Sequence, residues 1–253
     1  HLGDGGILSR GGLDMTFCVL VPTIRRHLPG FDETMATVEA SFTLPTEFHI
    51  VDGHGGKVPA LNRAFDEVLW ATSADVYVTL DDDYLIEPGW QDDLVAAFVA
   101  LPKAGIVAPY FGDDAESQRL MGPDSYEEWQ SIAEIRVRKL KKHRHIPGGM
   151  LAFRKEVALA IGKQPTTGIA YEVYEDAWRG RMAQKLGWDA YYVATRVPRL
   201  IEYDDDPAYV EQKQKDIDES RRIMHDLMGK DGVADPWSWR LRRWIAKIRG
   251  RAV

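Results

Sequence analysis

The sequence predicts an α/β protein with a mostly parallel β-sheet flanked by helices and a C-terminal helical extension. Two observations lead to this fold class. Short, continuous apolar runs alternate with segments of helical periodicity, and carboxylates follow directly after two of the runs. Continuous apolar runs are typical of strands buried on both faces, and repeated strand–helix order implies right-handed βαβ units. Ligands of such sheets bind beyond the carboxyl ends of the strands, where the carboxylates are expected to lie.

Composition limits the class of protein. The 253 residues contain 32 Lys and Arg against 39 Asp and Glu, so the formal net charge is −7. This balance argues against a broadly nucleic-acid-binding surface, and no apolar run approaches the ~20 residues that span a bilayer. Cys18 is the single cysteine, so we expect no internal disulfide framework and no cysteine-based zinc site. We therefore expect a soluble, cytoplasmic protein.

The first half of the chain consists of alternating predicted strands and helices. The first strand is the apolar run at 17–22, and a helix follows over 31–42, where apolar residues have helical spacing. A second strand at 47–52 ends on Asp52, before a glycine-rich loop. The alternation continues with an amphipathic helix over 60–70, a strand over 75–80, a helix over 90–101 and a strand over 104–109.

The second half is less regular. Residues 111–145 are predicted to be an insertion that holds one basic helix over 126–142. The remaining predicted elements are strands over 149–153 and 188–194 and helices over 155–161, 174–186, 207–228 and 236–251.

Three consecutive carboxylates, Asp81, Asp82 and Asp83, follow the third strand. If the backbone stays extended, Asp81 and Asp83 point to one side and Asp82 to the other. Two carboxylates on one side can hold a hard divalent ion such as Mg²⁺ or Mn²⁺ and leave positions for phosphate oxygens. The alternative is an acidic turn that caps the helix beginning near Pro88. Because caps seldom need three acids so early, the pattern favours a metal site.

Six short motifs occur in a particular order, and together they carry a resemblance. They are Val21-Pro22-Thr23, Val51-Asp52-Gly53, Ala60-Leu61-Asn62-Arg63, Leu80-Asp81-Asp82-Asp83, the run Pro-Gly-Gly-Met-Leu-Ala-Phe-Arg at 147–154, and Glu175-Asp176. In this order and spacing, over roughly residues 17–194, the chain resembles the GT-A glycosyltransferases of family 2. No single motif is specific, so the resemblance depends on their joint order.

The resemblance implies a division of the chain. Residues 15–206 would form the GT-A catalytic domain, with a nucleotide-binding half at 15–110 and an acceptor-side half at 146–206. Residues 1–14 are expected to be a vector-derived or disordered N-terminus ahead of a native start at Met15. Residues 207–253 would form a helical extension with a basic, Trp-rich tail.

The resemblance also implies a donor site. The implied nucleotide- and donor-binding residues are Pro22, Thr23, Asp52, Asn62, Arg63, Asp81, Asp82, Gly148 and Gly149, with Asp83 and Asp81 as metal ligands. Asp52 would accept a hydrogen bond from the base, or simply cap its loop. The two glycines would let the backbone approach the sugar, or form a turn. Bound Mn²⁺ or Mg²⁺ would offset charge on the leaving diphosphate.

Asp176 is the implied catalytic base. It precedes a predicted helix, whose dipole favours the ionised carboxylate, and a base must lie within hydrogen-bond reach of the acceptor hydroxyl. Glu175 would help to position the acceptor. The alternative is an acidic pair that only stabilises the helix N-terminus. The usual outcome in the family is direct displacement with inversion at the sugar carbon.

The chain departs from the family pattern in two ways. The stretch after the strand at 188–194 lacks the histidine that many members use as a further metal ligand; Glu202, Asp204 or the more distant His225 are candidate substitutes. The Gln-x-x-Arg-Trp motif and membrane helices of the polymer synthases are absent from the sequence given. Transfer of one sugar per binding event is therefore favoured over processive synthesis.

Two basic segments stand out in this acidic chain. Residues 136–145 contain six Lys and Arg and no acid, which fits a lid over diphosphate or an anionic acceptor, or a solvated helix face. Residues 237–249 combine an apolar face with arginines. In decreasing order of preference, that pattern fits a helix that packs on the protein body, a helix that lies peripherally on the inner membrane face, and a segment whose arginines bind nucleic-acid phosphates.

The function expected from these features is metal-dependent transfer of a sugar from a UDP- or GDP-sugar to an acceptor hydroxyl. The acceptor classes are a saccharide, a lipid-linked sugar, a small metabolite and, least favoured, a hydroxylated base in DNA. One alternative is a nucleotidyltransferase of similar fold, although the segment after the first strand has few glycines. The other is an inactive nucleotide- or sugar-binding module anchored by its basic tail.

Overall fold

The computed structural model describes residues 15–110, 125–142, 144, 146, 149–169, 175–194 and 199–228. The statements below concern these residues. The expected N-terminal segment 1–14, the expected tail helix at 236–251 and Gly148 lie outside them.

An eight-stranded sheet forms the centre of the fold, in the order β2-β1-β3-β8-β5-β9-β7-β6. All of its strands run in one direction except β8 and β7, which are antiparallel to their neighbours. The strands are β1 Phe17–Thr23, β2 Thr46–Asp52, β3 Val76–Leu80, β5 Ala104–Pro109, β6 Gln130–Ile132, β7 Ile135–Lys139, β8 Met150–Arg154 and β9 Asp189–Val193. A separate short ladder pairs β4 (Tyr84–Leu85) with β10 (Arg199–Leu200).

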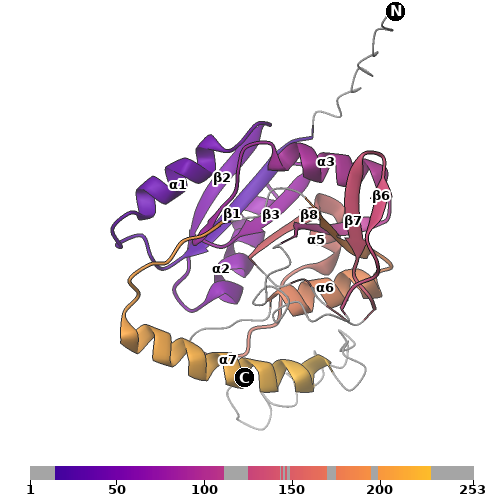
Figure 1. Ribbon diagram of the computed structural model, residues 1–253. Coiled ribbons are helices and arrows are strands. Elements are labelled where there is room, and N and C mark those ends of the chain that lie inside the picture. The colour runs from indigo at the N-terminus through magenta and orange to yellow at the C-terminus, as the bar shows by residue number, and fades with distance from the viewer. Residues whose placement is uncertain are drawn as a thin grey trace, which may run out of the picture.

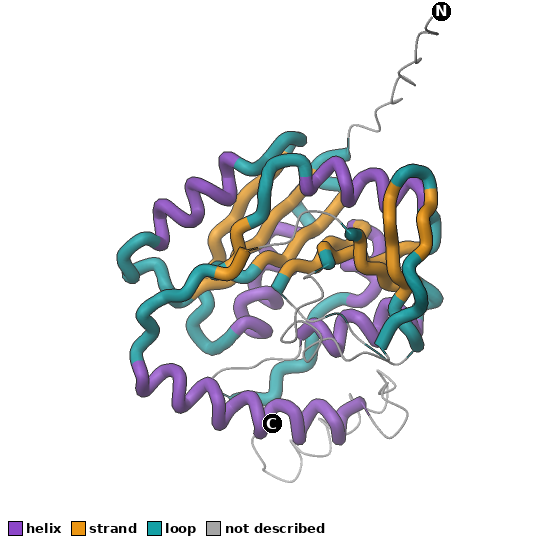
Figure 2. Tube along the Cα trace, viewed as in Figure 1, coloured by secondary structure: helices purple, strands orange, loops and turns teal. Residues whose placement is uncertain are grey.

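Helices cover both faces of the sheet (Figure 1; Figure 2). α1 (Phe31–Ala40) and α3 (Trp90–Ala100) pack on one face. α2 (Lys57–Ala64) with its π-helical continuation η1 (Phe65–Leu69), α5 (Lys155–Ile161) and α6 (Glu175–Lys185) pack on the other. In Figure 1, α7 (Pro207–Met228) lies below α2 and α6. The predicted α/β class is confirmed.

Strand β1 explains why two cores form. Phe17, Val19 and Val21 belong to the core under α1 and α3, whereas Cys18 and Leu20 belong to the core under α2, α5 and α6. Successive side chains of a strand point to opposite faces, so a continuous apolar run fills both cores. The burial of the whole strand follows directly from this.

The helix predicted over 126–142 is wrong. The segment instead forms an antiparallel hairpin of β6 and β7, with β7 paired to β9. Val137 is 1% exposed while Arg136 is exposed, so apolar and basic residues alternate with the period of two that a strand requires. Ala133 and Glu134 take positive φ at the turn. Because these basic residues lie in the sheet, Arg136–Lys139 do not form the expected helical lid.

The other predicted elements within the described residues are present with small shifts at their ends. The direction of β8 was not predicted: it is inserted antiparallel between β3 and β5. Within the described part of the chain, no helix combines the length and the apolar character that crossing a membrane requires.

Candidate functional site

Four chain segments meet at one edge of the sheet. β1 ends at Thr23, β2 ends at Asp52 and β3 ends just before Asp81, while the antiparallel β8 begins just after Gly149. Backbone hydrogen bonds tie them together: Asp81 N donates to the Gly149 carbonyl at 2.8 Å, and Gly53 N donates to the Thr23 carbonyl at 2.7 Å. The edge is therefore a continuous backbone platform under the polar side chains described next.

The three aspartates form a turn, which we call the acid turn (Asp81–Asp83). The extended backbone stops at Leu80, and Tyr84 N donates to the Asp81 carbonyl at 3.2 Å. The expected separation of Asp82 from the other two is therefore wrong, because it assumed that the strand continues. Asp81 contacts Lys57, whereas Asp82 and Asp83 share a different cation.

That cation is Arg25, which is 8% exposed. Its Nη1 lies 2.6 Å from Asp82 Oδ1 and 3.3 Å from Asp83 Oδ2, and its Nη2 lies 2.6 Å from Asp205 Oδ2. Thr23 Oγ1 donates to the second oxygen of Asp82 at 2.5 Å. Burial alone would lower the pKa of Arg25, but the three carboxylates raise it well above its usual value. Both oxygens of Asp82 are thus engaged within the protein.

The second cation is Lys57, at the start of α2. Its ammonium contacts Asp81 and lies 2.6 Å from Glu175 Oε1. Burial opposes its charge, but the two carboxylates outweigh that effect and raise its pKa. Burial also raises the pKa of Asp81 to about 7, against the opposing effect of Lys57. Two predicted site residues, Asp81 and Glu175, are therefore brought together through a lysine that the sequence reasoning missed.

The cluster has more negative than positive charge. Five carboxylates (Asp81, Asp82, Asp83, Glu175 and Asp205) surround the two cations Arg25 and Lys57. Asp83 Oδ1 is buried and has no hydrogen-bond partner among the described residues. A buried, unpaired carboxylate oxygen is costly, and a hard divalent cation is the kind of ligand that would satisfy it.

The segment before α7 covers the acid turn. Ile201 N donates to the Asp83 carbonyl at 2.8 Å, and the Tyr203 hydroxyl donates to the Asp82 carbonyl at 3.2 Å. Glu202 and Asp204, the expected substitutes for the missing histidine, are both exposed, and within the described part of the chain neither side chain forms a hydrogen bond or ion pair with the turn. Asp205 reaches it instead, through Arg25. The side chain of His225 lies outside the described residues.

The residues expected to bind the nucleotide, Asp52 at its base and Asn62 and Arg63 near the nucleotide or its phosphates, have different placements. Asp52 is exposed and accepts a hydrogen bond from His54 N at 3.0 Å; bonds from His54 lower the pKa of Asp52. Arg63 donates to the Asp52 carbonyl. Asn62 is committed elsewhere, since its amide exchanges hydrogen bonds of 2.8 and 3.0 Å with the backbone of Gln164. Asn62 therefore anchors the segment after α5.

Asp176 lies in the first turn of α6, next to Glu175. Its Oδ1 accepts a hydrogen bond from Ala177 N at 2.6 Å, as a carboxylate at a helix N-terminus commonly does. Its charge adds to burial in raising the pKa of Tyr192 on β9. Asp176 is thus the immediate neighbour of Glu175, the residue that Lys57 links to the acid turn.

Gly149 is required by a close contact inside the protein. A Cβ at this position would lie 2.1 Å from Cζ of Tyr84, so the ring occupies the space that a side chain would need. Tyr84 is next to the acid turn, and burial together with Asp81 and Asp83 raises its pKa. The glycine therefore lets an aromatic ring pack directly beneath the carboxylates.

Comparisons with known proteins support the fold. No family model and no curated protein matches the sequence. The structure is similar to a mannosyltransferase from Pyrobaculum calidifontis, solved with GDP-Man and Mn²⁺, at 19% identity and TM-score 0.53 over 87% of this chain and 66% of that chain. It is also similar to glucosyl-3-phosphoglycerate synthase from Mycobacterium tuberculosis, solved with Mn²⁺, UDP and phosphoglyceric acid, at 15% identity and TM-score 0.52 over 88% and 80%. The chain therefore has the GT-A fold of nucleotide-diphospho-sugar transferases.

Proposed function

We propose that this protein is a glycosyltransferase that uses a divalent metal ion and a UDP- or GDP-sugar to transfer one sugar, with inversion, to an acceptor hydroxyl. The observation that carries the proposal is the acid turn, where a surplus of carboxylates faces the strand-end edge of a GT-A fold. The two similar structures were solved with Mn²⁺ and a nucleotide or nucleotide-sugar, which supports the same ligand class here.

The acid turn fits a metal ion because its carboxylates are unequally engaged. Asp83 has a buried oxygen with no hydrogen-bond partner among the described residues, and Asp81 is held by Lys57 through its side chain and by Gly149 through its backbone. These two side chains would hold Mn²⁺ or Mg²⁺, while Asp82 keeps the turn in shape through Thr23 and Arg25. When bound, the ion neutralises charge on the departing diphosphate.

The remaining chemistry belongs to the protein. Asp176 would accept the proton of the acceptor hydroxyl as that oxygen forms its bond to the sugar carbon. The bond from that carbon to the diphosphate breaks, and its electron pair leaves with the nucleoside diphosphate. Lys57 joins Glu175, the neighbour of the base, to Asp81 on the donor side. This link would fix the position of the catalytic base Asp176 relative to the donor site.

The donor site is tested by thermal unfolding with a panel of nucleoside diphosphates and triphosphates, with and without Mn²⁺. One diphosphate is expected to stabilise the protein only with metal, by about 2.7 kcal/mol at 100 times its Kd. Asp83→Asn should abolish this effect, whereas Asp66→Asn, at an exposed position of η1, should keep it. Stabilisation by no nucleotide, or by a triphosphate in preference, would overturn the proposal.

The base is tested separately with Asp176→Asn. Turnover of the donor identified above should fall by about 10²–10⁴-fold, the usual contribution of a general base. Metal-dependent stabilisation by the diphosphate should not change, because Asp176 is not assigned to the donor site. If turnover persists, Asp176 acts only at the helix terminus.

A further inference from the structure

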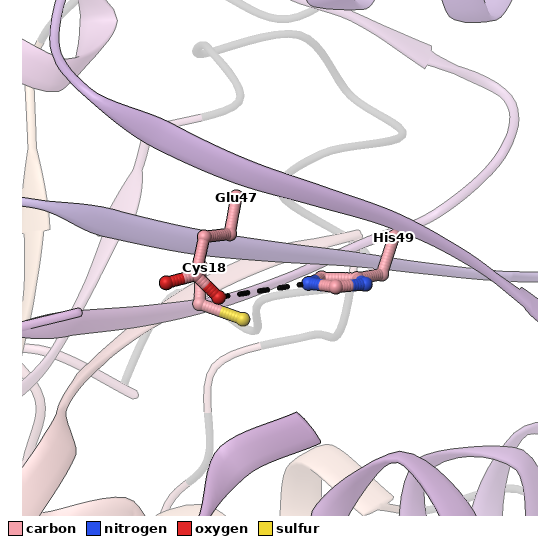
Figure 3. Close-up of side chains that lie close together, drawn as sticks. All are labelled: Cys18, Glu47 and His49. Atoms are coloured by element: carbon pink, nitrogen blue, oxygen red, sulfur yellow. Dashed lines mark ion pairs between the residues drawn. The ribbon is translucent and has the colours of Figure 1, made fainter. Parts of the chain in front are cut away.

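Three potential metal ligands gather on the first two strands (Figure 3). They are Cys18 on β1 and Glu47 and His49 on β2. One ligand atom from each, the cysteine sulfur, a carboxylate oxygen and a ring nitrogen, lie within 4.8 Å of one another. His49 Nε2 is 3.8 Å from Glu47 Oε2.

The sheet itself produces this cluster. Cys18 is the register partner of Glu47 in the parallel β1–β2 ladder, so their side chains leave the sheet on the same face about 4.8 Å apart. His49 is two residues beyond Glu47, which places it on that face as well. The backbone hydrogen bonds of the sheet therefore hold the three side chains together without help from a loop.

The histidine has an unused ligand atom. His49 Nε2 is buried and has no hydrogen-bond partner among the described residues, and a buried polar atom normally has one. The Cys18 sulfur is buried beside it, while Glu47 is exposed. The cluster thus combines a buried sulfur, which the Thr72 hydroxyl and the Lys155 ammonium also approach, a ring nitrogen that lacks a partner among the described residues, and a carboxylate at the surface.

We propose that Cys18, Glu47 and His49 bind a zinc-type divalent cation, with water as the fourth ligand. Thiolate, imidazole and carboxylate are the ligands that Zn²⁺ takes in tetrahedral sites, whereas the all-oxygen acid turn suits Mn²⁺ or Mg²⁺. A single cysteine argued against such a site from the sequence; the ladder register supplies the other two ligands. On binding, the Cys18 thiol gives its proton to solvent and forms the sulfur–metal bond.

Only a small rearrangement is needed. Tetrahedral bonds of about 2.0–2.3 Å bring ligand atoms to roughly 3.5 Å from one another, so the present separations, none above 4.8 Å, must shorten by at most about 1.3 Å. Glu47 is at the surface and its side chain can rotate to achieve this. The site is distinct from the acid turn, because Cys18 and Thr23 are five residues apart along β1, or about 16 Å.

The experiment uses the full chain and Co²⁺ as a spectroscopic substitute for Zn²⁺. Excess Mg²⁺ is present throughout to occupy the acid turn. Co²⁺ is expected to give a near-ultraviolet thiolate charge-transfer band and intense visible bands of tetrahedral coordination, which one equivalent of Zn²⁺ removes. His49→Gln should weaken Zn²⁺ binding by at least roughly 100-fold, because loss of a hydrogen-bond partner of a ligand alone costs about 10–100-fold, and Cys18→Ser should abolish the charge-transfer band.

Two controls separate this site from the others. His54→Gln, an exposed histidine two residues beyond β2, and Asp83→Asn should both retain the cobalt spectrum. Position 18 is buried, so Cys18→Ser can fail to fold. In that case the Zn²⁺ affinity of His49→Gln, on the partly exposed edge strand β2, tests the proposal without it. Absence of the charge-transfer band from the unmodified protein, or unchanged Zn²⁺ affinity in His49→Gln, would overturn the proposal.

Discussion

At the scale of single residues, Lys57 bridges Asp81 and Glu175, two carboxylates that are 94 positions apart in the sequence. Lys57→Met should destabilise the protein by about 3–5 kcal/mol, the cost of breaking a buried ion pair. The loss should be larger at pH 8 than at pH 5, since a proton can replace the ammonium between Asp81 and Glu175 at the lower pH. Urea unfolding at both pH values measures it.

The matched control for this prediction is Lys163→Met. Lys163 pairs with Asp66, and both side chains are about half exposed. Exposed pairs contribute about 0–1 kcal/mol, so this variant should change stability little at either pH. Equal losses for Lys57→Met at pH 5 and pH 8 would contradict the assignment of Lys57 as a counter-ion.

Arg25 provides a second prediction at this scale. A lysine has no planar fork, so it cannot hold Asp82 and Asp205 at the same time. Arg25→Lys should cost about 1–3 kcal/mol, and combining it with Asp205→Asn should be non-additive by about 0.5–3 kcal/mol. The free energy of unfolding in urea tests both statements. The control is Arg26→Lys at the exposed neighbouring residue, whose free energy of unfolding should lie within about 0.5 kcal/mol of that of the unmodified protein. If the losses from Arg25→Lys and Asp205→Asn are additive in the double variant, Arg25 does not hold the two aspartates together.

Some residues of this cluster could be predicted from the sequence and others could not. The aspartates and Glu175 lie in short motifs or at ends of predicted elements, where carboxylates are conspicuous. Arg25, Lys57 and Asp205 could not be found in the same way, because each acquires its role from a partner far along the chain. The basic pair Arg25-Arg26 after the first strand was the only local signal.

At the scale of elements, the β6–β7 hairpin is anchored by one fully buried side chain. Val137 of β7 belongs to the core under α1 and α3, against which Ile132 and Ile135 also pack while only partly buried. Val137→Ala should destabilise the protein by about 1–3 kcal/mol through lost burial and a residual cavity. Thermal or urea unfolding gives the value. Ser131→Ala, on the exposed face of β6, is the control, and similar losses in both variants would contradict the alternation.

The elements differed in how well they could be predicted. Long, fully apolar runs such as β1 are hard to mistake, because few structures bury every side chain of seven residues. The hairpin strands have three and five residues and are rich in arginine, so their period of two was easily taken for a helix. The direction of β8 could not be predicted, since an apolar run reads the same in either orientation.

At the scale of the whole molecule, stability should depend on pH through Asp81. The pKa of this carboxyl rises from 3.8 to about 7 on folding, so the folded state binds more protons than the unfolded state between those values. Stability therefore falls as pH rises from about 4 to about 7 and is level above. Urea unfolding in chelator across this range should show the slope. Asp81→Asn should flatten it, Asp66→Asn should not, and an unchanged slope in Asp81→Asn would refute the assignment.

The position of β8 has a consequence for how the protein is made. β3 lies between β1 and β8 in the sheet, yet β8 follows it by about seventy residues. During synthesis, one edge of β3 therefore stays unpaired, and such edges are prone to aggregation. The late segments also bring Gly149, Glu175 and Asp205 to the acid turn. A nascent chain thus completes its carboxylate cluster only after β8 has paired with β3. A chain that stops before β8 would have an aggregation-prone unpaired strand and an incomplete site.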